Sequence, residues 1–196
     1  MREVIAVDID EVLFPFVQEF VAYDNQRSGG ELAASDFFCY RFEHVLDISL
    51  EEAVQRVYSF NGAPHDHISP IAEAQEAIAQ LGQSYDLSVV TARHPQFEAN
   101  TERWLNRYMG GFFSEVVHVG YAAVMERPQR KVDVCQRLGA VALIDDSVEH
   151  VSECAEAGLE GVLFGDYEWN QVKELPGGVT RCKDWRAVLE YFDGRD

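Results

Sequence analysis

The sequence predicts an α/β fold: a doubly wound parallel sheet of about five strands, with a small helical cap inserted after the first strand. Two observations lead to this prediction. Short, β-branched apolar runs alternate with helical patterns along the chain, which is typical of strands and helices in a parallel sheet. A long helical stretch without a convincing strand separates the first run from the second. With 196 residues, 47% of them apolar, the chain can bury a core.

Five apolar runs are the candidate strands. Each is short, is bounded by turn residues and shows little polar alternation, as expected of strands buried on both faces of a parallel sheet. The runs are Val4–Val7, Leu87–Val90, Val116–Val119, Val141–Ile144 and Gly161–Phe164.

Helical patterns follow these runs. Ser69-Pro70 combines a capping hydroxyl with a proline and predicts a helix start, and Gly82 predicts its end. Four further helices are expected from Pro95 to Tyr108, over Lys131–Leu138, over Val148–Ala157 behind the capping Ser147, and over Trp185–Phe192.

Residues 15–75 interrupt this alternation. Helical patterns cover Phe16–Arg27 and Leu50–Phe60, and Ser49 stands three residues before Glu52 in the spacing of a capping box. Because a connection of this length would be unusual as plain loop, we expect residues 15–75 to form a helical cap. Residues 1–14 and 76–196 would then form the α/β core.

Charge and composition limit the kinds of partner that this protein is expected to bind. The formal net charge of −18 repels phosphate backbones and argues against duplex nucleic acid. No run approaches the roughly 18 apolar residues of a membrane span, the N-terminus does not resemble a signal peptide, and the four cysteines lack metal-site spacing. We therefore expect a cytoplasmic protein with reduced thiols and no membrane partner, and we leave a homodimer open.

Acidic residues follow two of the predicted strands. Asp8 and Asp10 come after the first, and Asp145 and Asp146 follow the fourth. Because ligands bind outside the carboxyl ends of parallel strands, these carboxylates should share one crevice. Two like charges ~4 Å apart cost about 4 kcal/mol at an effective dielectric of 20, so a divalent cation is expected between them. Ligands that are all oxygen favour Mg²⁺.

The same edge offers donors for a phosphoryl group. Thr91 ends the second run and supplies a hydroxyl, Ala92 and Arg93 supply amides in the following turn, and Lys131 supplies an ammonium group. Such groups stabilise the charge that spreads over a transferring phosphoryl group. The Arg93 side chain is predicted either to contact the substrate phosphate or to pair with a surface acid.

Aromatic residues crowd the predicted cap and its entrance. Phe14 and Phe16 are candidate substrate-binding residues that could stack on a nucleobase, and the alternative is that they belong to the core of the cap. For His65 and His67, an exposed turn is favoured over a metal site.

Four segments together resemble the motifs of the haloacid dehalogenase (HAD) superfamily. Asp8-Ile-Asp10-Glu-Val-Leu resembles the DxDx[V/T][L/V] motif, and Val-Val-Thr91-Ala-Arg resembles the second motif. Lys131 corresponds to the third motif, and Ala-Leu-Ile-Asp145-Asp146-Ser resembles the fourth motif. The four segments follow one another along the chain in the same order as the four motifs of the superfamily. The resemblance covers nearly the whole predicted core.

The resemblance implies roles for these residues. Asp8 would be the nucleophile that forms an aspartyl-phosphate, and Asp10 the acid and base. Mg²⁺ would be held by the Asp8 carboxylate, the Asp10 main-chain carbonyl and Asp145, with Asp146 orienting that shell or Lys131. Thr91, Ala92 and Lys131 would bind the phosphoryl group.

Within the superfamily, the sequence looks most similar to the 5′(3′)-deoxyribonucleotidase-like branch with a C1-type helical cap. One position departs from that branch: residue 11 is Glu, where the branch usually has Gly. Glu11 adds negative charge and removes backbone freedom beside the predicted site, and therefore bears on the substrate class and on turnover.

The leading hypothesis is a Mg²⁺-dependent phosphomonoesterase for a small metabolite such as a nucleoside or deoxynucleoside 5′-monophosphate. A second is a HAD-like binding or interaction module with lost or weak turnover, which Glu11 alone supports. A third, a receiver-like signalling domain, conflicts with the motif order, because receivers carry their acidic pair after the first strand.

Overall fold

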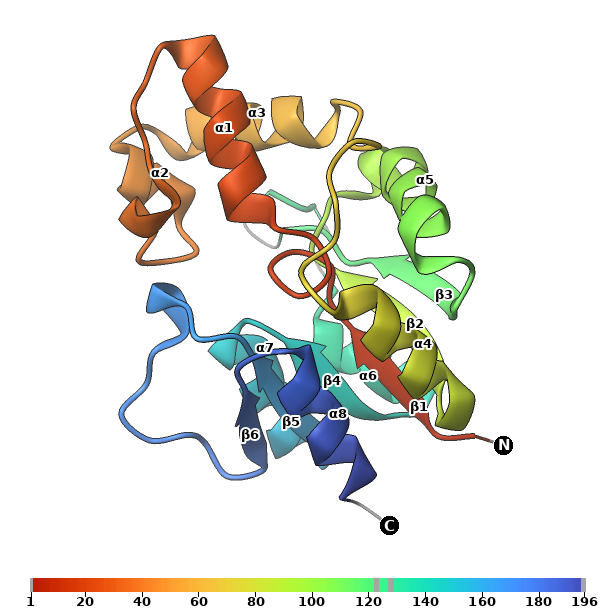
Figure 1. Cartoon of the computed structure of the whole chain (residues 1–196). Coiled ribbons are helices and arrows are strands. Elements are labelled where there is room, and N and C mark those ends of the chain that lie inside the picture. The colour runs from red at the N-terminus through yellow and green to blue at the C-terminus, as the bar shows by residue number, and fades with distance from the viewer. Residues whose placement is uncertain (1, 122–123, 127–128, 195–196) are drawn as a thin grey trace.

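The computed structural model describes residues 2–121, 124–126 and 129–194. Its centre is one parallel sheet in the order β3-β2-β1-β4-β5-β6 (Figure 1). The strands are β1 (Val4–Val7), β2 (Asp86–Thr91), β3 (Phe113–His118), β4 (Ala140–Asp145), β5 (Glu160–Phe164) and β6 (Val179–Cys182). The parallel α/β architecture is thus confirmed, with six strands instead of about five.

The strand missing from the prediction, β6, lies at one edge of the sheet. It pairs with β5 from Gly161↔Val179 to Phe164↔Cys182. Its two ends are buried, but Thr180 and Arg181 between them are not. Since an edge strand has only one neighbour and buries fewer side chains, its sequence lacks the continuous apolar run that marks the central strands.

Helices cover both faces of the sheet. One face carries α4 (Ala74–Ser84), α5 (Glu98–Met109) and α8 (Trp185–Asp193), and the other carries α6 (Lys131–Leu138) and α7 (Val148–Glu156). In β1, Ile5 and Val7 belong to the first core and Ala6 to the second, and all three are fully buried. Burial on both faces explains why the strand is apolar without alternation.

Helix α4 starts later and ends later than predicted. The Ile71 amide donates a hydrogen bond to the Leu13 carbonyl at 2.8 Å, which ties the chain after Ser69-Pro70 to the segment following β1. The helix begins only at Ala74, after Glu73 with a φ of 65°. It also continues through Gly82 to Ser84, because a glycine lowers helix propensity but does not end a helix by itself.

The segment between β1 and α4 is helical. Residues 16–61 form α1 (Phe16–Ser28), a 3₁₀ turn η1 (Ala34–Asp36), α2 (Phe42–Leu46) and α3 (Leu50–Asn61), without a strand in this fully described range. The predicted N-terminal capping residue of helix α3, Ser49, is confirmed, since its Oγ accepts a hydrogen bond from the Glu52 amide at 3.1 Å. Figure 1 shows this helical group at the end of the sheet where β1 leads into it.

Two further 3₁₀ turns, η2 (Pro95–Phe97) and η3 (Glu168–Asn170), flank the site described below. In the part of the chain that the structure describes, no helix has the length and apolar character required to cross a membrane.

Candidate active site

The strand order reverses beside β1, which lies between β2 and β4. In an open parallel sheet, such a switch point leaves a crevice outside the carboxyl ends of the strands. Asp8 follows β1 directly, and its amide donates to the Ile144 carbonyl of β4 at 2.9 Å. Asp145 is the last residue of β4. The sheet therefore brings together two carboxylates that are far apart in sequence.

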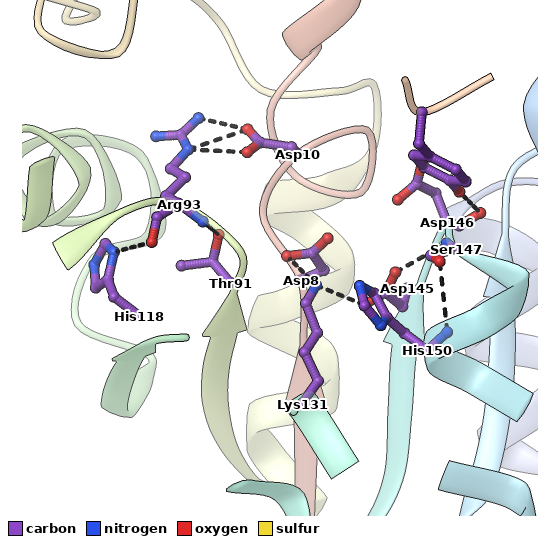
Figure 2. Close-up of polar contacts among 11 residues, drawn as sticks. Asp8, Asp10, Thr91, Arg93, His118, Lys131, Asp145, Asp146, Ser147 and His150 are labelled. Carbon is purple, nitrogen blue, oxygen red and sulfur yellow. Dashed lines mark hydrogen bonds and ion pairs between the residues drawn. The ribbon is translucent and has the colours of Figure 1, made fainter. Parts of the chain in front are cut away.

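Lys131 joins these two carboxylates. Its Nζ lies 2.8 Å from Asp8 Oδ1 and 2.7 Å from Asp145 Oδ2, as Figure 2 shows. Lys131 is 1% exposed and Asp145 is fully buried, so this contact is shielded from water. The first turn of α6 places the lysine, and the Ser147 amide holds Asp145 Oδ1 at 2.9 Å. The predicted convergence of Asp8, Lys131 and Asp145 is present.

The charged groups of this cluster shift one another's pKa values. Burial raises the pKa of Asp8 to about 7, although Lys131 opposes the shift. Burial, together with the charges of Asp145 and Asp8, also raises the pKa of Asp146 well above its ordinary range. Burial alone would lower the pKa of Lys131, but the two neighbouring carboxylates raise it above its ordinary value. One ammonium group thus faces an excess of negative charge.

The acidic cluster matches the needs of a divalent cation. Oxygen atoms of Asp8, Asp145 and Asp146 all lie within 4.8 Å of one another. Asp8 Oδ1 is buried and in ion-pair contact with Lys131, but it makes no hydrogen bond by geometry. Carboxylate oxygens without nitrogen or sulfur ligands favour Mg²⁺.

Asp146 is held by aromatic side chains instead of by Lys131. Trp169 Nε1 donates to Asp146 Oδ2 at 2.8 Å, and the Tyr40 hydroxyl donates to the Asp146 carbonyl at 2.5 Å. Asn170 Nδ2 donates to the same carbonyl at 3.2 Å. Tyr40 comes from the helical group and Trp169 from η3, so Asp146 links the two parts of the chain.

Asp10 lies apart from the lysine cluster and pairs with Arg93. Arg93 Nη2 is 2.6 Å from Asp10 Oδ1, and Arg93 is 4% exposed. Arg93 thus pairs with an acid of the predicted site at a partly buried contact, and not with a surface acid. Its contact with a substrate phosphate stays a prediction. Thr91 is fully buried at the end of β2, and its Oγ1 accepts from the Arg93 amide at 3.2 Å. Ala92 is half-buried in the same turn.

Two aromatic candidates lie in the core. Phe14 is fully buried and Phe16 is 7% exposed, and both pack on Phe60. This is the arrangement of core residues, and a role in substrate binding stays a prediction. The expectation of an exposed His65 is wrong, because this ring packs between Phe14 and Phe60 with centroid distances of 5.1 and 4.5 Å.

Glu11 occupies a turn that suits glycine. Its φ is 59°, the left-handed region in which a Cβ is unfavourable. The side chain compensates, because Oε1 accepts from the Val17 amide in the first turn of α1 at 2.5 Å, and the carbonyl accepts from the Tyr167 hydroxyl at 2.8 Å. Burial raises the pKa of Glu11 to about 7.

A cavity of about 410 Å³ opens beside Glu11, between the helical group and the chain around η3. Its lining includes three acids, Glu11, Asp166 and Glu168, and three aromatic residues, Phe37, Tyr167 and Trp169. None of the residues described as lining it is Lys, Arg or His. Tyr167 and Trp169 stack with centroids 4.6 Å apart. The sequence gives no signal for Tyr167 or Trp169, since neither belongs to a motif.

The described fold is that of haloacid dehalogenase-like proteins. A haloacid dehalogenase-like family hydrolase from Streptococcus pneumoniae superimposes with a TM-score of 0.69, at 17% identity, over 97% of this chain and 98% of the other. A protein from Bacillus subtilis named as a HAD-hydrolase, solved bound to magnesium, gives 0.67 at 14% identity over 98% and 99%. A predicted phosphoglycolate phosphatase from Haemophilus somnus gives 0.69 at 14% identity over 97% and 98%.

No protein-family model matches the sequence, and a search among curated proteins returns no match. At these identities the likeness establishes the fold. The substrate has to be argued from the site.

Proposed function

We propose that this protein is a Mg²⁺-dependent phosphomonoesterase with Asp8 as the nucleophile. The observation that carries the proposal is the buried contact of Lys131 Nζ with Asp8 Oδ1 at 2.8 Å and Asp145 Oδ2 at 2.7 Å. An ammonium group and a cation site beside one carboxylate are the surroundings that phosphoryl transfer requires. The fold shared with HAD-like proteins supports the same reading.

Each residue has a separate part in this proposal. An Asp8 oxygen attacks phosphorus and forms an aspartyl-phosphate, while Asp10 protonates the oxygen of the departing alcohol and later accepts a proton from the hydrolytic water. Thr91, Ala92 and Lys131 bind the phosphoryl oxygens.

Asp8, Asp145 and the Asp10 carbonyl would hold Mg²⁺, with Asp146 beside them. The bound ion would neutralise charge on the phosphoryl group. The oxygen-only cluster of Asp8, Asp145 and Asp146 and the magnesium bound to the Bacillus subtilis protein support this choice of ion.

Residues 15–75, which contain the helical group, serve as the cap of this enzyme, and residues 1–14 and 76–196 as its core. The link between Tyr40 and Asp146 supports this division, because it joins the helical group to the carboxyl end of β4. A cap that contacts the acidic cluster can exclude water from the reaction.

The substrate is a small monophosphate. The lining of the cavity beside Glu11 includes none of Asp8, Asp10, Thr91 and Lys131, so the cavity would hold the leaving group and not the phosphoryl group. Its volume of about 410 Å³ is within the range of roughly 300–1,000 Å³ for small-molecule sites. Its three acids would repel a second phosphate, whereas its aromatic residues suit a flat or apolar leaving group. A nucleoside or deoxynucleoside 5′-monophosphate meets these conditions, and so does a neutral sugar or alcohol phosphate.

The test is phosphate release from a panel of monophosphates and bisphosphates, with Mg²⁺ and with EDTA. We expect monophosphates to be preferred and EDTA to abolish turnover. Asp8→Asn should lower kcat by at least about 10³-fold, as expected for loss of a covalent nucleophile. Asp86→Asn is the matched control, because Asp86 is exposed at the opposite end of β2. Equal rates for wild type and Asp8→Asn would refute the assignment.

A further inference from the structure

The geometry at Asp10 suggests a part for Arg93 that no motif specifies. Arg93 Nε lies 3.1 Å from both carboxylate oxygens of Asp10, and Nη2 lies 2.6 Å from Oδ1. Figure 2 shows the guanidinium group facing the carboxylate edge on. Paired contacts of this kind fix the orientation of a carboxylate as well as its position, which a lysine cannot do.

Arg93 is itself held in place. Its guanidinium carbon lies 4.7 Å from the centroid of the Phe14 ring, and Nη1 donates to Thr101 Oγ1 at 3.4 Å. The backbone of Arg93 is also engaged, since its amide donates to Thr91 and its carbonyl lies 3.3 Å from His118 Nδ1. With only 4% of the residue exposed, the side chain has little freedom to move before a substrate arrives.

Asp10 depends on this arginine. Within residues 2–121, 124–126 and 129–194, the hydrogen bonds that the Asp10 carboxylate accepts come from Arg93. The Asp10 side chain is 27% exposed and can therefore meet a substrate oxygen. Oδ1 receives two of the contacts and Oδ2 one, so Oδ2 is the oxygen left to give or accept a proton.

We infer that Arg93 is a positioning residue that orients the Asp10 carboxyl group for proton transfer, and that it does not bind the substrate phosphate directly. Paired binding of a phosphate through Nε and Nη2 would break the contacts with Asp10 and deprive that carboxylate of its arginine partner. This inference rests on the proposed function, in which Asp10 protonates the leaving oxygen.

Leaving groups of different basicity separate this role from a structural one. An alkyl alkoxide is strongly basic and leaves only with a proton, whereas p-nitrophenolate leaves without one. General acid catalysis contributes about 10²–10⁴-fold. A misplaced Asp10 should therefore lower kcat/KM for an alkyl phosphate by about 10–10²-fold while leaving kcat/KM for p-nitrophenyl phosphate nearly unchanged. The later proton transfer from water, which both esters share, follows departure of the alcohol and enters kcat but not kcat/KM.

The experiment measures kcat and KM for p-nitrophenyl phosphate and for the best alkyl phosphate of the panel, with Arg93→Lys, Asp10→Asn and the double variant. Arg103→Lys is the matched control, because Arg103 is exposed on α5. We expect Arg93→Lys to lower kcat/KM for the alkyl ester at least 10-fold more than for the aryl ester. In the Asp10→Asn background, Arg93→Lys should then add no further loss.

A second variant covers the case in which Arg93→Lys does not fold. Thr101→Val keeps the arginine and removes only its Nη1 contact, and it should give a smaller loss with the same preference for the alkyl ester. Equal losses of kcat/KM on both esters would overturn the inference, as would a rise in KM alone or a further loss on top of Asp10→Asn. Wild-type protein that releases phosphate from neither ester would refute the proposed function, and the inference would fall with it.

Discussion

Replacing Lys131 by Met removes the ammonium group between Asp8 and Asp145 while keeping a side chain of similar length. Each lost contact, at 2.7–2.8 Å, corresponds to about 6 kcal/mol of gross attraction at an effective dielectric of 20. The cost of burying the charges offsets much of this, and removal of one partner of a buried ion pair typically costs about 3–5 kcal/mol. We expect a loss of that size in EDTA at pH 8, above the pKa of about 7 for Asp8.

Magnesium should restore part of the lost stability. Without the lysine, a cation becomes the main counter-charge for Asp8, Asp145 and Asp146, so the variant should gain more from Mg²⁺ than the wild type. A ligand at 100 times its Kd stabilises a protein by about 2.7 kcal/mol, and we expect the gap between variant and wild type to shrink by at least about 1 kcal/mol.

The measurement is urea unfolding followed by tryptophan fluorescence, in EDTA and in Mg²⁺. Lys173→Met is the control, because Lys173 is exposed and makes no ion pair among the described residues. It should change neither the stability in EDTA nor the gain from Mg²⁺. A Lys131→Met protein as stable as wild type in EDTA would refute the electrostatic reasoning. A gap of 3–5 kcal/mol that Mg²⁺ leaves unchanged would refute the cation site.

Two further changes test contacts around the site. Burial raises the pKa of Glu11 from 4.5 to about 7, so between these values the folded state keeps a proton that the unfolded state releases, and stability falls as the pH rises. Glu11→Gln should therefore be more stable than wild type by up to about 3 kcal/mol at pH 8 in EDTA and equal to it at pH 4, and an equal stability at pH 8 would contradict the shift. Tyr40→Phe loses the hydroxyl that donates to the Asp146 carbonyl, which is worth about 1 kcal/mol and should lower Tm by about 2–4 °C. Tyr58→Phe is its control in thermal unfolding, and an unchanged Tm for Tyr40→Phe would show that the contact contributes nothing.

The central strands and the convergence of the main site could be predicted from the sequence. Strands buried on both faces have apolar side chains at most positions, so β1, β2 and β4 are visible as runs such as Val4–Val7. Their carboxyl ends meet at one edge of a parallel sheet, which is why Asp8 and Asp145 could be placed together without coordinates. These inferences use only local patterns and one topological rule.

Local patterns failed where a distant contact decided the structure. The start of α4 depends on a hydrogen bond between Ile71 and Leu13, and β6 depends on pairing with β5. The sequence around His65 looks like an exposed loop, yet the ring is buried between two phenylalanines. None of these partners is close enough in sequence to leave a pattern.

The sequence by itself determined the layered α/β class, the helical character of the stretch after the first strand and which strand ends carry the acids. Only the tertiary structure decided the partner of each polar side chain: Arg93 with Asp10, Tyr40 with Asp146 and Glu11 with Val17. The physical reason is that periodicity records how much of a segment is buried. The direction and partner of a side chain depend on packing against residues far away in the chain.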